Sequence, residues 1–160
     1  MSLKKKNFSL ALAIAAFILY FFGFCALLDM ATVPVISIIE ICLGLASAII
    51  SAIFFFKETM DSKKILISLS LLTVSLICGN ITDLTSWTFA GVGRILVFLI
   101  PLILFAISFA NKKIEQFVGI SFIVMCILCT YFAFSGNFIY ASAAALFIAF
   151  SMKLFNNKEE

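Results

Sequence analysis

The chain has 160 residues, of which 64% are hydrophobic and only 12% are charged, and its mean hydropathy is +1.25. A soluble domain carries about 25% charged residues, and so short a chain cannot bury such an apolar excess in its own core. The net charge is +3, histidine is absent and the longest polar stretch, residues 57–64, is only a loop, which excludes a nucleotide-binding or other soluble domain within these residues.

The first two predicted membrane spans cover residues 8–28 and 33–56. Each is about as long as a helix needs to be to cross a hydrocarbon core of roughly 30 Å at about 1.5 Å per residue. Three consecutive lysines precede the first span, and Thr32-Val33-Pro34 predicts an N-cap and a first helical turn at the start of the second. Lys57 marks the end of the second span.

The third and fourth predicted spans cover residues 65–80 and 89–110. A polar stretch, residues 82–87, separates them and predicts an outer turn. Pro101 lies inside the fourth span, where we expect a kink that neighbouring helices tolerate.

Residues 117–152 carry no charge and are about twice too long for one span. Ser135-Gly136-Asn137, near their middle, is a turn signal. The stretch therefore predicts two helices, over residues 114–134 and 138–155.

The basic residues are divided very unequally between the two ends of these helices. Only Arg94 belongs to one set of ends, and ten lysines belong to the other: Lys4, Lys5, Lys6, Lys57, Lys63, Lys64, Lys112, Lys113, Lys153 and Lys158. Under the positive-inside rule both termini are cytoplasmic, which requires an even number of spans. The fold prediction is an all-α, polytopic membrane bundle in the cell membrane, with six transmembrane helices in three hairpins that form one transmembrane domain.

Polar residues recur at a fixed interval along the predicted hairpins. Asp29, Asp83 and Asn137 follow one another at intervals of 54 residues, and Glu40 and Arg94 are also 54 residues apart. The pattern is typical of duplicated hairpins, although outer turns must contain polar residues in any case. The third unit is shorter and has no charge at the matching position.

Glu40 and Arg94 are the most informative residues, because an ionised side chain inside a span is costly and needs a partner. Both lie roughly 25 Å from the inner end of their helices, counted at about 1.5 Å per residue. One interpretation is a structural ion pair between the second and fourth helices, or two side chains that extend toward the outer interface. The other is a binding site for a solute or ion that opens outward, with Asp29 and Asp83 at its rim.

Cys126 and Cys129 form a C-x-x-C pair on a predicted helix. Quinone-linked disulfide-forming membrane enzymes resemble this chain in that motif and in being small helical bundles. Those enzymes also need a second, outward-facing pair, for which only Cys25 and Cys78 are candidates. Inert packing of the cysteines is the alternative, and without histidine no metal site is predicted.

Small residues recur at helix-packing spacing in Gly44-x-x-x-Ala48-x-x-x-Ala52, in Ser47-x-x-x-Ser51 and in Ser142-Ala143-Ala144-Ala145. Such faces let two helices approach closely, either within one chain or between two copies. The phenylalanines, 20 in all, are expected to face lipid or to fill gaps between helices.

The predicted function is that of a small non-enzymatic membrane protein that binds or passes a small solute or ion. An accessory, immunity or stress-type subunit with purely structural charges is a second hypothesis, and a thiol-disulfide oxidoreductase is a third. No cofactor and no nucleic acid is expected. The expected partners are the lipid bilayer and either another membrane protein or a second copy of the chain.

Overall fold

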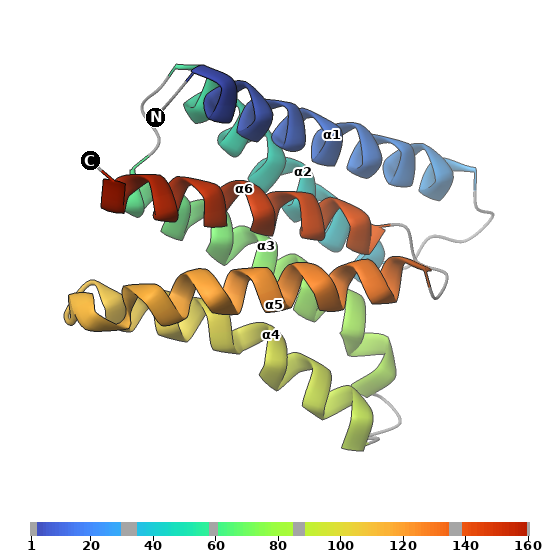
Figure 1. Cartoon of the computed structure of the whole chain (residues 1–160). Helices are drawn as coiled ribbons and strands as arrows, with labels where there is room; N and C mark the ends of the chain where they lie inside the picture. The colour runs from blue at the N-terminus through green and yellow to red at the C-terminus, as the bar shows by residue number, and fades with distance from the viewer. Residues whose placement is uncertain (1–2, 30–34, 58–60, 85–88, 135–138, 160) are drawn as a thin grey trace.

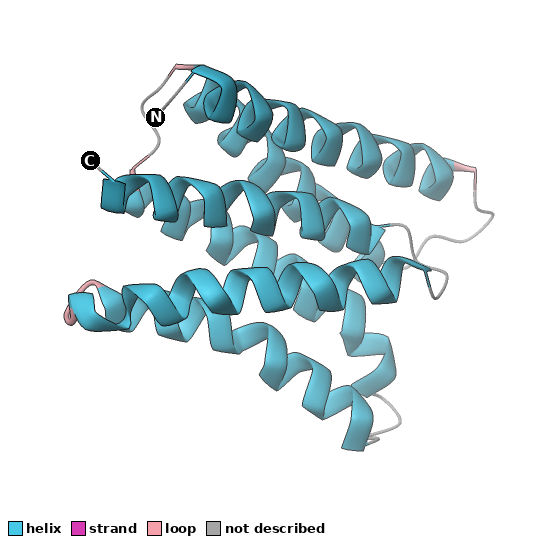
Figure 2. Ribbon diagram, viewed as in Figure 1, coloured by secondary structure: helices cyan, strands magenta, loops and turns pink. Residues whose placement is uncertain are grey.

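The computed structural model describes residues 3–29, 35–57, 61–84, 89–134 and 139–159. Within these residues every regular element is a helix, as predicted (Figure 2). The helices are α1 (Leu3–Leu28), α2 (Val35–Phe56), α3 (Ser62–Leu84), α4 (Phe89–Ser108), the short 3-10 helix η1 (Lys112–Ile114), α5 (Glu115–Phe134) and α6 (Ile139–Glu159). The N-cap and first helical turn predicted at Thr32-Val33-Pro34, and the turn predicted at Ser135-Gly136-Asn137, fall outside the described residues.

Helix α6 lies at the centre of the bundle (Figure 1). Each helix packs on its neighbours in the chain, and α6 also packs on α1 and reaches α2 and α3. Small side chains such as Ser142 and Ala143 are fully buried along α6, so its neighbours can approach its backbone closely. The prediction that residues 142–145 form a close-packing face is consistent with this burial.

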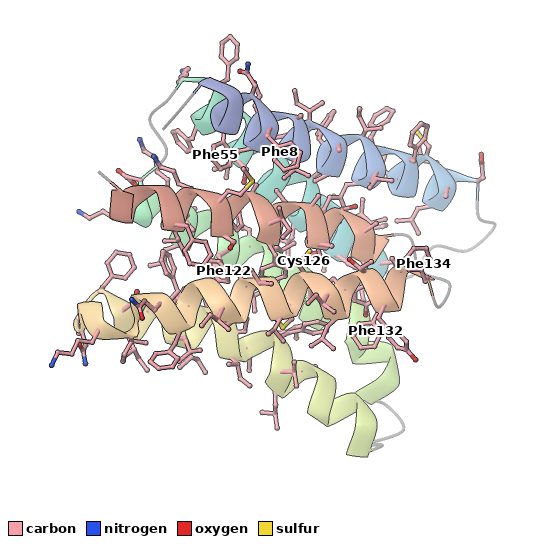
Figure 3. All side chains as sticks on the ribbon, viewed as in Figure 1. Phe8, Phe55, Phe122, Cys126, Phe132 and Phe134 are labelled. Atoms are coloured by element: carbon pink, nitrogen blue, oxygen red, sulfur yellow. The ribbon has the colours of Figure 1, made fainter. Side chains whose placement is uncertain are left out.

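Apolar side chains cover the outside of the bundle as well as its core. Large exposed ones occur on every α-helix from α1 to α6, and among them Phe134 is 86% exposed (Figure 3). Three helical segments are long and apolar enough to cross a membrane, residues 7–28, 35–56 and 116–134, and residues 95–108 and 140–155 form shorter apolar helices. Such a surface suits a bilayer rather than water.

Helix α3 is longer than the predicted span at both ends. It begins after Asp61, whose Oδ1 accepts a hydrogen bond from the Lys64 N–H at 2.9 Å, the geometry of an N-cap. It ends at Leu84, so the prediction of a turn that begins at Thr82 is wrong, and Asp83 belongs to the last helical turn. Polar residues alone do not break a helix, and this stretch contains no glycine or proline to do so.

Glu40 lies in the second turn of the described part of α2, and Arg94 lies in the second turn of the described part of α4. Helix α4 continues through the buried Pro101. Its N-terminal half diverges from α5 (Figure 1).

Lysines with described side chains all lie where helices meet at one end of the bundle. The first turn of α1 and the last turn of α6 lie at this same end (Figure 1). The lysines are Lys57 after α2, Lys63 and Lys64 in the first turn of α3, Lys113 in η1 and Lys153 in α6. The Lys64 Nζ lies 4.6 Å from the centre of the Phe54 ring, a cation–π contact between α3 and α2.

Candidate functional site

Glu40 lies in the second turn of α2 and is half-buried against α3. Its carboxylate lies over the backbone of Gly79: a Cβ added to that glycine would be 2.5 Å from the Glu40 Oε1. Real Cβ atoms do not come so close to another heavy atom, so the carboxylate can take this position only because residue 79 has no side chain. Glycine 79 therefore forms one wall of the site.

Ser75 holds the backbone of Glu40 in place. Its Oγ donates a hydrogen bond of 2.6 Å to the Glu40 carbonyl oxygen, and its side chain is buried between the helices. Ser75 and Gly79 are four residues apart and so lie on one face of α3. Glu40 is thus fixed at its backbone by one residue of this face and contacted at its carboxylate by the other.

Tyr20 of α1 closes the site from the other side. Its ring is fully buried and lies on Gly44 of α2 so closely that a Cβ there would overlap the ring. Its hydroxyl lies close to Ser75 and within electrostatic range of Glu40, but it makes no hydrogen bond of good geometry. Side chains of α1 and α3 therefore lie around one carboxyl group of α2.

Two turns further toward the lysine end, α2 and α3 are joined by a cluster of buried serines, Ser47, Ser51 and Ser68. The Ser68 Oγ lies 2.9 Å from the Ser47 Oγ and 2.7 Å from the Ser51 Oγ. The Ser47 Oγ also donates to the Ser68 carbonyl oxygen at 2.8 Å, and the Ser68 Oγ donates to the Ser47 carbonyl oxygen at 3.1 Å. We call this set the serine clamp; it fixes the register of α2 on α3, and hence the position of Glu40 over Gly79.

The other predicted charges are placed less completely. Asp29 is exposed directly after α1, Asp83 lies in the last turn of α3 and Arg94 lies in the second turn of α4, but the side chains of the last two fall outside the described part of the structure. Helices α2 and α4 share no contact in the described residues, because α3 packs between them.

The two cysteines of the C-x-x-C pair lie on α5. Cys129 is fully buried and Cys126 is half-buried, while Cys25 is exposed and Cys78 is half-buried. All the cysteines are free thiols. In the described residues, no three side chains of the kinds that ligate metals lie close enough together to hold an ion.

The sequence did not predict a role for Tyr20, Ser75 or Gly79, although these residues surround Glu40. A signal for part of this arrangement is present, because Ser68 and Ser75 on α3 have the same spacing of seven residues as Glu40 and Ser47 on α2. Two antiparallel helices that pack at this period meet at matching positions every two turns. Nothing in the order of residues links Tyr20 to this pair.

Comparisons with protein-family models, curated proteins and solved structures give no match for this chain.

Proposed function

We propose that the chain crosses the cell membrane six times, as three hairpins with both termini in the cytoplasm. The apolar outer surface and the three long apolar helices support membrane insertion, and the lysines gathered at one end support the orientation. In this arrangement Glu40 lies within the membrane, nearer the outer surface than the lysine end. The exposed Asp29 marks the outer end of α1.

Within that bundle we propose a non-enzymatic site that binds or passes a small solute or ion at Glu40. The observation that carries the proposal is the position of its carboxylate, half-buried against Gly79 in an otherwise uncharged helix, with no cationic side chain at ion-pair distance among the described residues. A charged group within a span costs roughly 2.5–3.5 kcal/mol on insertion scales. A bound cation or proton offsets that cost.

Asp29, Asp83 and Arg94 complete the proposed site at its outer rim. Asp29 and Asp83 end α1 and α3, and Arg94 lies one and a half turns from the start of α4. Two carboxylates near the outer surface attract cations from the medium and raise their local concentration. The positive charge of Arg94 on α4 would repel cations and so limit how many gather at the rim.

Thermal unfolding of the purified protein in detergent, with and without added solutes, tests this proposal. The probes are the chlorides of sodium, potassium, ammonium, choline and guanidinium at constant ionic strength. A solute that binds the folded state raises the midpoint of unfolding, and at a concentration of 100 Kd it stabilises that state by about 2.7 kcal/mol. We expect at least one probe to raise the midpoint, and Glu40→Gln to remove that shift.

Asp61→Asn is the matched control, since it makes the same chemical change at the lysine end and asparagine also caps helices well. It should keep the full shift. The proposal fails if no probe stabilises the unchanged protein, or if Glu40→Gln responds as the unchanged protein does.

A further inference from the structure

Several hydroxyl groups are buried in the bundle without a hydrogen-bond partner. In the described residues they belong to Ser9, Tyr20, Thr73 and Ser142. Each is at most 1% exposed. A buried hydroxyl without a partner costs about 1–3 kcal/mol, so native structures rarely leave such groups unpaired.

Three of these four hydroxyls lie at about the same height along the bundle as Glu40. Tyr20 lies within electrostatic range of Glu40, Cys129 and Tyr140. Ser142 is two residues from Tyr140, and Thr73 is two residues from Ser75, so each is only about 3 Å further along its helix than a residue of this level. Ser9 is eleven residues from Tyr20, about three turns away. We call Tyr20, Thr73 and Ser142 the hydroxyl layer, because these three hydroxyl groups, on α1, α3 and α6, lie at about the height of the carboxylate.

The chemistry of this level restricts what it can bind. Its ligand atoms are the oxygens of one carboxylate and of hydroxyl groups, which prefer hard cations to soft metals. The single negative charge of Glu40 balances one positive charge, whereas protein sites for divalent cations combine several charged ligands. The ring of Tyr20 covers Gly44, one turn along α2 from Glu40, so a bulky ligand is excluded there. These constraints describe a small monovalent cation.

We propose that Glu40, Tyr20 and Ser75 bind a sodium ion or a hydronium ion, and that the hydroxyl layer continues this site into the bundle. The inference rests on the proposed function and names its ligand. The carboxylate supplies the charge, the Tyr20 hydroxyl supplies an oxygen that makes no hydrogen bond of good geometry, and the Ser75 Oγ keeps a lone pair while it donates to the Glu40 carbonyl. Among the described residues, the titratable groups within electrostatic range of the carboxylate are Tyr20 on α1 and Cys78 on α3. Tyr140 on α6 and Cys129 on α5 are within electrostatic range of Tyr20.

Uptake into liposomes that contain the protein tests the proposal in two arms. One arm measures radioactive sodium at equal pH on both sides, and the other measures internal pH with an encapsulated dye after an external pH step at equal sodium. In one arm or both we expect the unchanged protein to exceed protein-free liposomes. Tyr20→Phe should lower that uptake at least fivefold while its ring still covers Gly44, and Glu40→Gln should reduce it to the protein-free level.

Tyr131→Phe is the matched control, because Tyr131 is exposed on α5, and it should transport at the normal rate. Ser142→Ala tests the layer through a smaller change on another helix and should also lower uptake, which keeps the test decisive if Tyr20→Phe does not fold. Normal uptake by folded Tyr20→Phe or by Ser142→Ala, with Glu40→Gln inactive, overturns the hydroxyl layer and leaves the proposed function standing. Stabilisation by choline or guanidinium alone, with no uptake in either arm, likewise overturns only the choice of ligand. If Glu40→Gln behaves as the unchanged protein does in every assay, both the proposed function and the proposed cation site are wrong.

Discussion

Gly44 and Gly79 decide how closely side chains of one helix approach the backbone of the next. A methyl group at Gly79 would meet the end of the Glu40 side chain, which is flexible and can move aside. A methyl group at Gly44 would meet the ring of Tyr20, which is buried and held on all sides. The same substitution should therefore have different consequences at the two positions.

For Gly79→Ala we expect a folded protein with an impaired site. The new Cβ displaces the Glu40 carboxylate from the wall of α3, while the end of a flexible side chain can make room at little energetic cost. A loss of about 1.4 kcal/mol in binding would weaken affinity for the stabilising cation about tenfold. Titration of that cation against the midpoint of thermal unfolding measures the change.

Two other glycines, Gly93 on α4 and Gly44 on α2, serve as controls. Gly93→Ala places its methyl in open space and should change neither stability nor affinity noticeably. Gly44→Ala should instead lower the free energy of unfolding by about 1–3 kcal/mol, as overpacking of a filled core does. Unchanged cation affinity in Gly79→Ala would contradict the placement of the carboxylate.

At this scale the sequence predicted the importance of Glu40 and little of what surrounds it. Glu40 stands out in the sequence because an ionised carboxylate inside a membrane span costs free energy. Tyr20 does not stand out, because a tyrosine in a span is common and its contact with Gly44 depends on how α1 is rotated about its axis. Gly79 resembles any small residue until the neighbouring helix is placed.

Among the helices, α2 and α3 are joined by polar contacts, whereas α4, α5 and α6 are joined by aromatic ones. Phe122 of α5 lies 6.0 Å from Phe105 of α4 and 5.9 Å from Phe147 of α6, measured between ring centres. Near the other end of these helices, Phe98, Phe132 and Tyr140 form a second group. The bundle thus has a polar seam beside the proposed site and an apolar seam away from it.

Removal of the Ser68 hydroxyl should loosen the polar seam. Ser68→Ala deletes the bonds that this oxygen makes to Ser47 and Ser51. Hydrogen bonds between membrane helices contribute about 0.6 kcal/mol each on average, so we expect a loss of about 1–2 kcal/mol in the free energy of unfolding. Unfolding in mixed micelles, followed by circular dichroism, measures it.

Ser70→Ala is the comparison, because the Ser70 Oγ donates to the Leu66 carbonyl oxygen of its own helix, at 2.7 Å, and does not join α3 to α2. It should unfold within about 0.5 kcal/mol of the unchanged protein, as substitutions away from special contacts do. Equal effects of the two substitutions would show that the serine clamp contributes nothing particular to the packing of α2 on α3.

Helix positions were predictable from the lengths of the uncharged stretches, but helix ends were not. Polar residues near the end of α3 suggested a turn, yet the helix continues through Asp83. The start of α3 depends on the N-cap at Asp61, which is recognisable only once the helix is placed beside it. Capping and helix propensity act within a single turn, on a scale that hydropathy does not resolve.

Across the whole molecule, the sequence predicted that the bundle is surrounded by lipid, but it did not predict how the helices are arranged. Composition required a surface that faces lipid, and the exposed apolar side chains have that character. The central position of α6 could not be predicted, because its residues are no more apolar than those of the peripheral helices. What places it at the centre is its small side chains, which act only through contacts with four other helices.

The orientation of the whole bundle gives the last prediction. Positive charge is retained on the cytoplasmic side during insertion, and the lysines described here lie at one end, opposite Asp29. In a cysteine-free background, Asp29→Cys should therefore react with a membrane-impermeant maleimide in intact cells. Lys113→Cys, exposed at the lysine end, should react only after the cells are permeabilised. Phe122→Cys, in the core, should react in neither case, which shows that labelling reports exposure. The opposite pattern would place the lysines outside the cell and Glu40 in the cytoplasmic half of the membrane. The site would then bind ions from the cytoplasm.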